Sequence, residues 1–115
     1  LDRMLVMATL DDVRRIALAL PEVQEKPHFG MPAFRVADKG FVSVAKDHSR
    51  VLLYLDPAEV AAELALGDCQ RLTRFDVLIG LDADLSALDA ARLERLLHSA
   101  WRHRAPKAVI RRHQA

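Results

Sequence analysis

The first strong periodicity along the chain is helical. Apolar residues between positions 10 and 20 recur three and four apart, which places them on one face of a helix: Leu10, Val13, Ile16, Ala17 and Leu20. Thr9, followed three residues later by Asp12, has the pattern of a capping box at a helix start. Pro21 lacks the backbone donor that a continuing helix needs. The pattern predicts a first helix over residues 9–20.

An alternation with a period of two follows the loop of residues 21–32 and is typical of strands. Residues 33–36 and 41–44 flank a Lys39-Gly40 turn, so they are predicted to form a hairpin. The later candidates are residues 51–55, which are apolar enough for a central strand, and residues 71–75 and 76–81, which form two strands or one bent strand.

A second helix is predicted to begin at Asp56, an N-cap residue that precedes Pro57, and to end before Gly67. The last long helix is predicted over residues 86–104, with Ser86 and Asp89 as its capping box. Its apolar stripe is Ala90, Leu93, Leu96, Leu97, Ala100 and Trp101. Pro106 interrupts this helix, and residues 107–113 are predicted as a short helix that leaves the body.

The order of these elements favours an α+β fold, an antiparallel β-sheet with helices packed on one face in a two-layer sandwich. The chain has 115 residues, the size of one domain, so we expect a single domain over residues 1–115. Residues 1–6 precede the first helix signal and are expected to be an extension or tail.

The composition, 51% apolar and 29% charged, is that of an ordinary globular domain. No apolar run approaches the roughly 20 residues of a membrane-spanning helix. Residues 1–10 are too short for a signal-peptide core with a cleavage site. The single cysteine, Cys69, cannot form an internal disulfide. We therefore expect a cytoplasmic protein without a membrane partner.

Charge is distributed unevenly. The formal net charge is +1, but residues 92–115 hold seven basic residues against one acid, Glu94, so this C-terminal quarter carries +6 and residues 1–91 carry −5. A basic helix can lie along a phosphate backbone, and hairpin cations can touch a groove. The candidate nucleic-acid contacts are Arg35, Lys46, Arg102, Arg104, Lys107, Arg111 and Arg112. The alternative is that these cations complement the helix dipole and keep the surface solvated.

The loop before residue 33 carries His28 and Phe29 beside Gly30, where backbone can approach a partner closely. Loops on a rigid scaffold often carry binding groups, so His28 and Phe29 are candidates for a small-ligand site, together with Arg35 and Trp101. The alternative is that Phe29 plugs the edge of the core and His28 caps a backbone carbonyl.

Sequence motifs for catalysis are missing: there is no nucleophile elbow and no glycine-rich phosphate loop with its lysine. His98 and His103 are five apart, which places them on different faces of a helix. We expect no enzymatic activity, no catalytic residues, no cofactor and no metal site.

Several of these segments together resemble the MmcQ/YjbR family of bacterial proteins. The resemblance spans about residues 8–112, and its most characteristic stretches are Leu20-Pro21-Glu22-Val23, Lys26-Pro27-His28-Phe29-Gly30, Pro32-Ala33-Phe34-Arg35-Val36 and the Ala100-Trp101 to Ala105-Pro106-Lys107 ending. It implies a fold similar to that of the frataxin homologue CyaY and a "double-wing" motif associated with DNA binding. We therefore consider two hypotheses, a non-enzymatic DNA-binding protein and a small-ligand or protein-interaction module that uses the His28-Phe29 loop.

Overall fold

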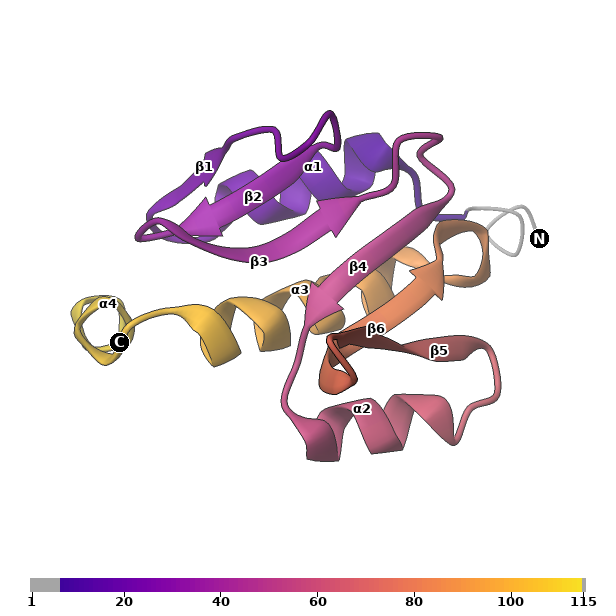
Figure 1. Ribbon diagram of the computed structural model, residues 1–115. Coiled ribbons are helices and arrows are strands. Elements are labelled where there is room, and N and C mark those ends of the chain that lie inside the picture. The colour runs from indigo at the N-terminus through magenta and orange to yellow at the C-terminus, as the bar shows by residue number, and fades with distance from the viewer. Residues whose placement is uncertain (1–6, 115) are drawn as a thin grey trace.

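The computed structural model describes residues 7–114, which form four α-helices and one antiparallel sheet (Figure 1). The helices are α1 (Leu10–Ala19), α2 (Pro57–Leu64), α3 (Ala90–Arg104) and α4 (Lys107–Arg112), and a 3₁₀ turn, η2, spans Leu85–Ala87. The strands are β1 (Val23–Glu25), β2 (Ala33–Val36), β3 (Lys39–Val44), β4 (Arg50–Tyr54), β5 (Cys69–Arg74) and β6 (Val77–Asp84). The predicted tail, residues 1–6, lies outside the described residues.

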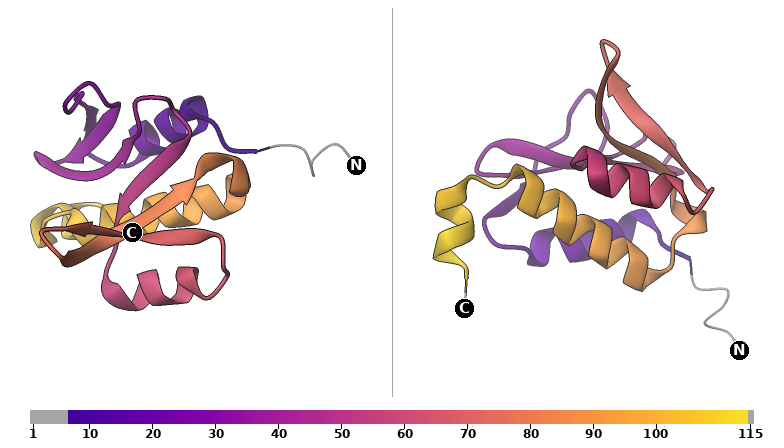
Figure 2. Two further views of the ribbon diagram at one scale, coloured as in Figure 1. Left: turned by 45° about the vertical axis from the view of Figure 1, so that its right-hand side comes forward. Right: turned by 90° about the horizontal axis from the view of Figure 1, so that it is seen from below.

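The six strands lie in the order β1-β2-β3-β4-β6-β5, and every neighbouring pair is antiparallel. Helices α1, α2 and α3 cover one face of this sheet (Figure 2). Inward-facing residues of the central strands, such as Val44, Leu53 and Leu81, are fully buried against them. Each such side chain contributes ~1.5–3 kcal/mol through removal from water. The structure confirms the predicted α+β fold with an antiparallel sheet and helices on one face.

Helix α1 begins as its sequence predicts. The hydroxyl of Thr9 accepts a hydrogen bond from the backbone N–H of Asp12, and the Asp12 carboxylate accepts one from the backbone N–H of Thr9 at 2.9 Å. This capping box satisfies two backbone donors that a helix start leaves unpaired. The helix buries Val13, Ile16 and Ala17 against the sheet and α3.

Three features differ from the sequence prediction. The β2–β3 turn is formed by Ala37 and Asp38, both with positive φ, because Val36 pairs with Lys39, and the predicted turn residues Lys39 and Gly40 lie in β3. Strand β1 occupies a stretch predicted as loop, because three residues pair with β2 while a bidentate ion pair between Arg14 and Glu25, 2.8 Å for each contact, ties the strand to α1. Helix α3 begins at Ala90 rather than Ser86. Ser86 belongs to η2, whereas Asp89 alone caps α3 by accepting from the Arg92 backbone N–H at 2.8 Å.

The late strands form a true hairpin, β5–β6, rather than one bent strand. Arg74 pairs with Val77, so only Phe75 and Asp76 make the turn. Both turn residues have positive φ, +51° and +65°, as a tight type I′ turn requires. Asn-Gly is the usual choice for this turn, and Phe-Asp in its place explains why the turn is poorly marked in the sequence.

Candidate functional site

The face of the sheet opposite α1, α2 and α3, here called the open face, carries a cavity of about 170 Å³ where β3 and β4 diverge. The strands pair from Val42 opposite Leu53 to Val44 opposite Val51, and Gly40 and Tyr54 lie beyond this paired stretch. The residues that line the cavity are His28, Ala33, Arg35, Gly40, Phe41, Val42, Ser43, Tyr54, Arg74 and Arg104. We call this site the arginine cavity, because three of its side chains are arginines from three separate elements.

Arg104, at the end of α3, bridges the two diverging strands. Its Nε donates to the backbone carbonyl of Gly40 at 2.9 Å, and its guanidinium carbon lies 4.8 Å from the centroid of the Tyr54 ring. This stacking is a cation–π contact. The Nη groups of Arg104 have no acceptor among the described residues. The side chain is therefore fixed on one side and free to donate on the other.

The other two arginines of the cavity are held loosely. Arg74 approaches the Tyr54 hydroxyl at 3.5 Å, and Arg35 approaches Asp38 at 3.5 Å, where 84% of the Asp38 side chain is exposed to solvent. Within the described part of the chain, no carboxylate lines the cavity. Three guanidinium groups around one concave site, without an acid among the lining residues, favour an anionic ligand.

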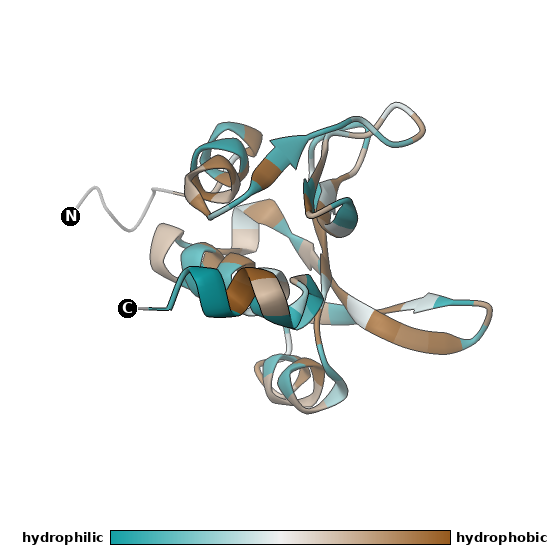
Figure 3. Ribbon diagram, turned by 90° about the vertical axis from the view of Figure 1, so that its left-hand side faces the viewer, coloured by the Kyte–Doolittle hydropathy of each residue, from teal (hydrophilic) through white to brown (hydrophobic). Residues whose placement is uncertain are grey.

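Two segments project from the sheet on the same side as the cavity (Figure 3). One is the loop of residues 26–32, which contributes His28 to the cavity, and the other is the β5–β6 hairpin, which contributes Arg74. Each segment presents an exposed phenylalanine next to its cavity residue, with exposed fractions of 81% for Phe29 and 92% for Phe75. The His28 and Phe29 rings meet edge to face with their centroids 4.4 Å apart. Phe29 is therefore solvated and does not plug the edge of the core.

The structure brings only part of the predicted set together. Arg35, Arg104 and His28, which belong to two different hypotheses, line one cavity. Lys46 lies under the 26–32 loop, where a Cβ added to Gly30 would be 3.3 Å from the Lys46 Cε.

The remaining predicted cations lie at the far end of the helix layer. Arg102, Lys107 and Arg111 are exposed, with no acidic partner among residues 7–114. Arg112 binds Glu22 through contacts of 2.9 to 3.1 Å, and His113 also lies 2.9 Å from this carboxylate. The hydrogen bonds from Arg112 and then His113 lower the pKa of Glu22. Arg112 is thus largely committed to a protein contact.

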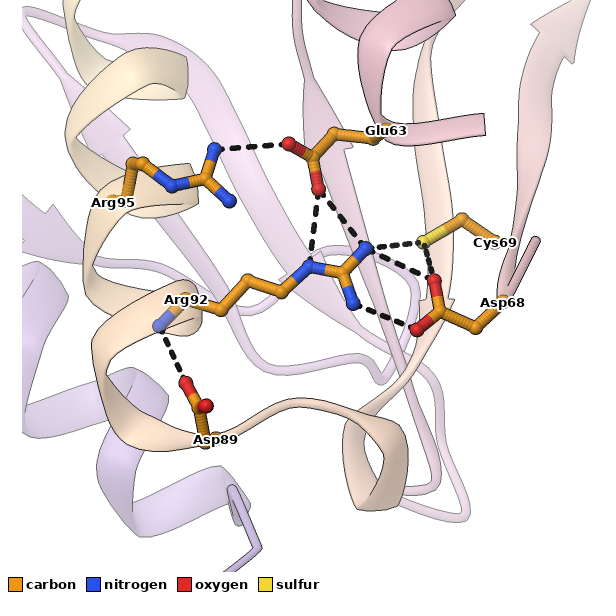
Figure 4. A network of polar contacts seen from close by, with 6 residues as sticks. All are labelled: Glu63, Asp68, Cys69, Asp89, Arg92 and Arg95. Carbon is orange, nitrogen blue, oxygen red and sulfur yellow. Dashed lines mark hydrogen bonds and ion pairs between the residues drawn. The ribbon is translucent and has the colours of Figure 1, made fainter. Parts of the chain in front are cut away.

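Two of the seven basic residues in the C-terminal quarter, Arg92 and Arg95, are paired with acidic residues of the fold (Figure 4). Arg92 donates to both oxygens of Asp68 at 2.7 and 2.9 Å and contacts Glu63, and Arg95 lies 2.9 Å from the other Glu63 oxygen. Hydrogen bonding from Arg92 and from Cys69 lowers the pKa of Asp68 to about 2. We call these residues, Glu63, Asp68, Arg92 and Arg95, the Arg92 network. It joins α2 to α3 and leaves two fewer cations for a partner.

Cys69 borders the Arg92 network and has the properties of an unreactive thiol. Burial, and then the hydrogen bond to Asp68, raise the pKa of its thiol to about 11. A thiol with such a pKa is almost entirely protonated at neutral pH and is a poor nucleophile. Trp101, considered above for the ligand site, instead packs in the helix layer and donates from Nε1 to the Pro21 carbonyl at 3.0 Å.

Tyr54 and Arg74 are among the cavity residues that the sequence did not single out. Tyr54 ends a strand in which the three preceding residues, 51–53, are apolar, and Arg74 precedes a turn whose boundary is weakly marked. The available signal was the Arg-Phe-Asp stretch at residues 74–76, in which an aromatic residue beside a cation occupies a hairpin tip.

Over residues 7–114, no three side chains of His, Cys, Asp or Glu lie close enough together to bind a metal ion. The helices of the same range are all too short or too polar to cross a bilayer.

Comparison with known proteins places this fold in a family. The chain matches none of the curated proteins. A solved structure, Deinococcus radiodurans protein DR2400 with a DUF419 domain, superposes with a TM-score of 0.68 at 21% sequence identity, covering 83% of this chain and 77% of that one. The YjbR family model matches residues 18–103, from the end of α1 to the last turn of α3. The chain belongs to the YjbR family.

Proposed function

We propose that this chain binds nucleic acid without catalysing a reaction on it, and that the arginine cavity on the open face contacts the phosphates. The observation that supports this proposal is the meeting of Arg35, Arg74 and Arg104 around one cavity that no carboxylate lines within the described residues. Guanidinium groups bind phosphate oxygens through paired hydrogen bonds, and their charge is not lost at any physiological pH.

The placement of these arginines matters as much as their number. Arg104 is already oriented by the Gly40 carbonyl and the Tyr54 ring, so little conformational entropy is lost when its free Nη groups bind an anion. The hydroxyls of Ser43 and Tyr54 add hydrogen-bonding groups to the same site. The C-terminal cations Arg102, Lys107 and Arg111 supply a second, more exposed set of contacts for a long polyanion.

The test compares two double variants that remove equal charge from different places. Arg35→Ala/Arg74→Ala removes cavity cations, and Lys107→Ala/Arg111→Ala removes exposed cations of α4. Binding of a fluorescein-labelled mixed-sequence DNA, as single strand and as duplex, is followed by fluorescence anisotropy at several salt concentrations. Each lost phosphate contact reduces the slope of log K against log salt by about 0.7–0.9.

The expected result is a slope on the order of −3 for the unaltered chain, reduced by about 2 in the cavity variant and by less in the α4 variant. Absence of binding to either DNA at 25 mM salt would sink the proposal. Binding that only the α4 variant weakens would move the interface to the C-terminal helix.

A second candidate is a small anionic ligand, because the arginine cavity is a concave site that His28 from the 26–32 loop also lines. Its volume of about 170 Å³ is small for a ligand pocket and limits the part of the ligand held inside to a group the size of a phosphate. Isothermal titration with AMP and with inorganic phosphate separates this candidate from the first. Saturable binding of AMP that the cavity variant abolishes, without binding of DNA, supports the small-ligand function.

A further inference from the structure

The two most exposed large apolar side chains of the described chain, Phe75 and Phe29, both flank the arginine cavity. Each follows a cavity residue directly in sequence, Phe75 after Arg74 and Phe29 after His28. Single exposed apolar residues are common on protein surfaces, but aromatic rings beside a cationic site mark a binding surface more often. The same arrangement, an exposed phenylalanine directly after a cavity residue, therefore occurs in two separate segments.

The backbone conformation at both phenylalanines also indicates a binding surface. Phe75 and Phe29 have φ values of +51° and +50°, a region that costs a residue with a Cβ some stability. Glycine or asparagine would adopt these turns more easily and would leave no ring in solvent. Phe75 lies in the two-residue turn between the paired Arg74 and Val77, and Phe29 lies in the turn between the bridged His28 and Met31. At both positions the chain holds a bulky aromatic residue in an unfavourable backbone conformation.

We propose that the open face selects unpaired nucleotides, with phosphates in the arginine cavity and bases stacked on Phe75 and Phe29. This inference rests on the proposed nucleic-acid function and names the form of nucleic acid that the site prefers. Every base has a π face, so stacking on an aromatic ring is tolerant of sequence. In a duplex those faces are already stacked on neighbouring bases, so a ring reaches them only at the cost of about a few kcal/mol for unstacking a base step.

Charge complementarity supports a nucleic-acid strand over an apolar partner. Arg35, Arg74 and Arg104 line the cavity that the two rings flank, so the occupant that suits this face is anionic in the cavity and flat and apolar where it meets Phe75 or Phe29. A single-stranded nucleic acid alternates phosphates and bases in this way. The exposed Val77, at the first residue of β6 beyond the turn, extends the apolar surface beside Phe75.

The experiment measures the affinity of the full chain for three labelled probes at 50 mM salt: a dT12 strand, a 12-base-pair duplex, and a 12-mer abasic strand that keeps phosphates but lacks bases. We expect dT12 to bind at least ten-fold more tightly than either other probe. Phe75→Ala should weaken dT12 binding by about five- to 100-fold, the range for loss of one stacked base. It should leave duplex and abasic binding within two-fold.

Three control variants keep the result interpretable. Leu66→Ala shortens a residue that is 59% exposed next to α2, away from the open face, and should change nothing. Phe75→Tyr retains a ring and should bind as the unaltered chain does. Phe75→Gly suits the positive φ and should fold at least as well, so its loss of dT12 binding cannot be attributed to unfolding.

The outcomes separate the two proposals. If duplex and dT12 bind equally, and Phe75→Ala changes neither while Arg35→Ala/Arg74→Ala weakens both, the preference for unpaired nucleotides is wrong and the nucleic-acid function stands. If none of the three probes binds, both proposals fail. If polyglutamate competes with dT12 at equal charge concentration, the face recognises acidic polymers in general and the stacking role is overturned.

Discussion

Substitution of Arg92 by methionine should destabilise the fold far more than the same change at Arg95. Both arginines contact Glu63, whose side chain is only 7% exposed, but their own exposures differ, 15% for Arg92 and 55% for Arg95. Loss of one partner of a buried ion pair costs about 3–5 kcal/mol, because a desolvated charge is left behind. Glu63 keeps Arg95 as a partner in Arg92→Met, so we expect a smaller loss of about 2–3 kcal/mol. The exposed Arg95 should contribute about 0.5–1 kcal/mol.

The measurement is urea unfolding at pH 7, followed by circular dichroism and by Trp101 fluorescence, with free energies from linear extrapolation. Addition of Glu63→Gln to Arg92→Met should recover part of the loss, because the uncompensated buried charge is then gone. Equal losses for Arg92→Met and Arg95→Met, or a double variant less stable than Arg92→Met, would refute the assignment of the cost to a buried carboxylate.

Arg92→Met should also change how the free energy of unfolding depends on pH in the acid range. Arg92 and Cys69 lower the pKa of Asp68 from 3.8 to about 2 in the folded chain. A carboxyl group whose pKa is lower when folded stabilises the fold above pH ~4, and this contribution is lost as the pH falls toward 2. Because 38% of the Asp68 side chain is exposed, solvent screening limits the effect to about 1 kcal/mol. In Arg92→Met the free energy of unfolding should fall less steeply between pH 4 and pH 2.

Three further outcomes can be checked on the same material. Gly80→Ala should lower the free energy of unfolding in urea by at least about 3 kcal/mol or prevent folding, because its Cβ would lie 1.8 Å from the Leu53 carbonyl oxygen. Gly40→Ala is the control, since no atom lies within 4 Å of its Cβ, and it should change the free energy of unfolding by less than about 1 kcal/mol. Cys69 should react with iodoacetamide at pH 8 at least ten-fold more slowly in buffer than in 8 M urea, because its thiol pKa of about 11 leaves little thiolate in the folded chain. Asp89→Ala should cost about 1 kcal/mol in the same unfolding assay, since it removes the only side-chain cap of α3, and an unchanged midpoint would contradict that role.

The elements that the sequence predicts well are those with local signals. The Thr9 capping box, the Asp56-Pro57 start of α2 and the apolar stripe of α3 each depend on residues three or four apart. The sheet with helices on one face follows from the order of such elements. By contrast, β1 forms because residues 23–25 pair with β2 and because Glu25 forms an ion pair with Arg14 of α1. The three residues of β1 carry no local sequence pattern that predicts a strand.

The arginine cavity could not be predicted because its residues come from six separate segments: the 26–32 loop, β2, β3, β4, β5 and α3. It exists where β3 and β4 diverge, and a register shift between Phe34 and Arg35 in the β2–β3 pairing lies beside it. Such irregularities depend on the packing of the whole sheet. The sequence did contain Arg35, Arg104 and His28 as candidates, but it assigned them to two competing hypotheses. Because the three side chains line one cavity, a phosphate-binding site and a site formed by the His28-Phe29 loop are the same place in the fold.

Arg104 shows why fold and proposed function are joined at this site. A sheet that paired β3 with β4 along their full length would close the cavity, and the gap between them is instead bridged by a guanidinium that donates to Gly40 and stacks on Tyr54. Its Nη groups remain without a protein acceptor in the described structure. An apolar side chain could fill the gap, but it could not donate to the Gly40 carbonyl, whereas arginine makes this hydrogen bond and still has Nη donors for an anion. Under the proposed function, these Nη groups are the ones that bind a phosphate, so the contacts of Arg104 that stabilise the fold also orient it for a ligand.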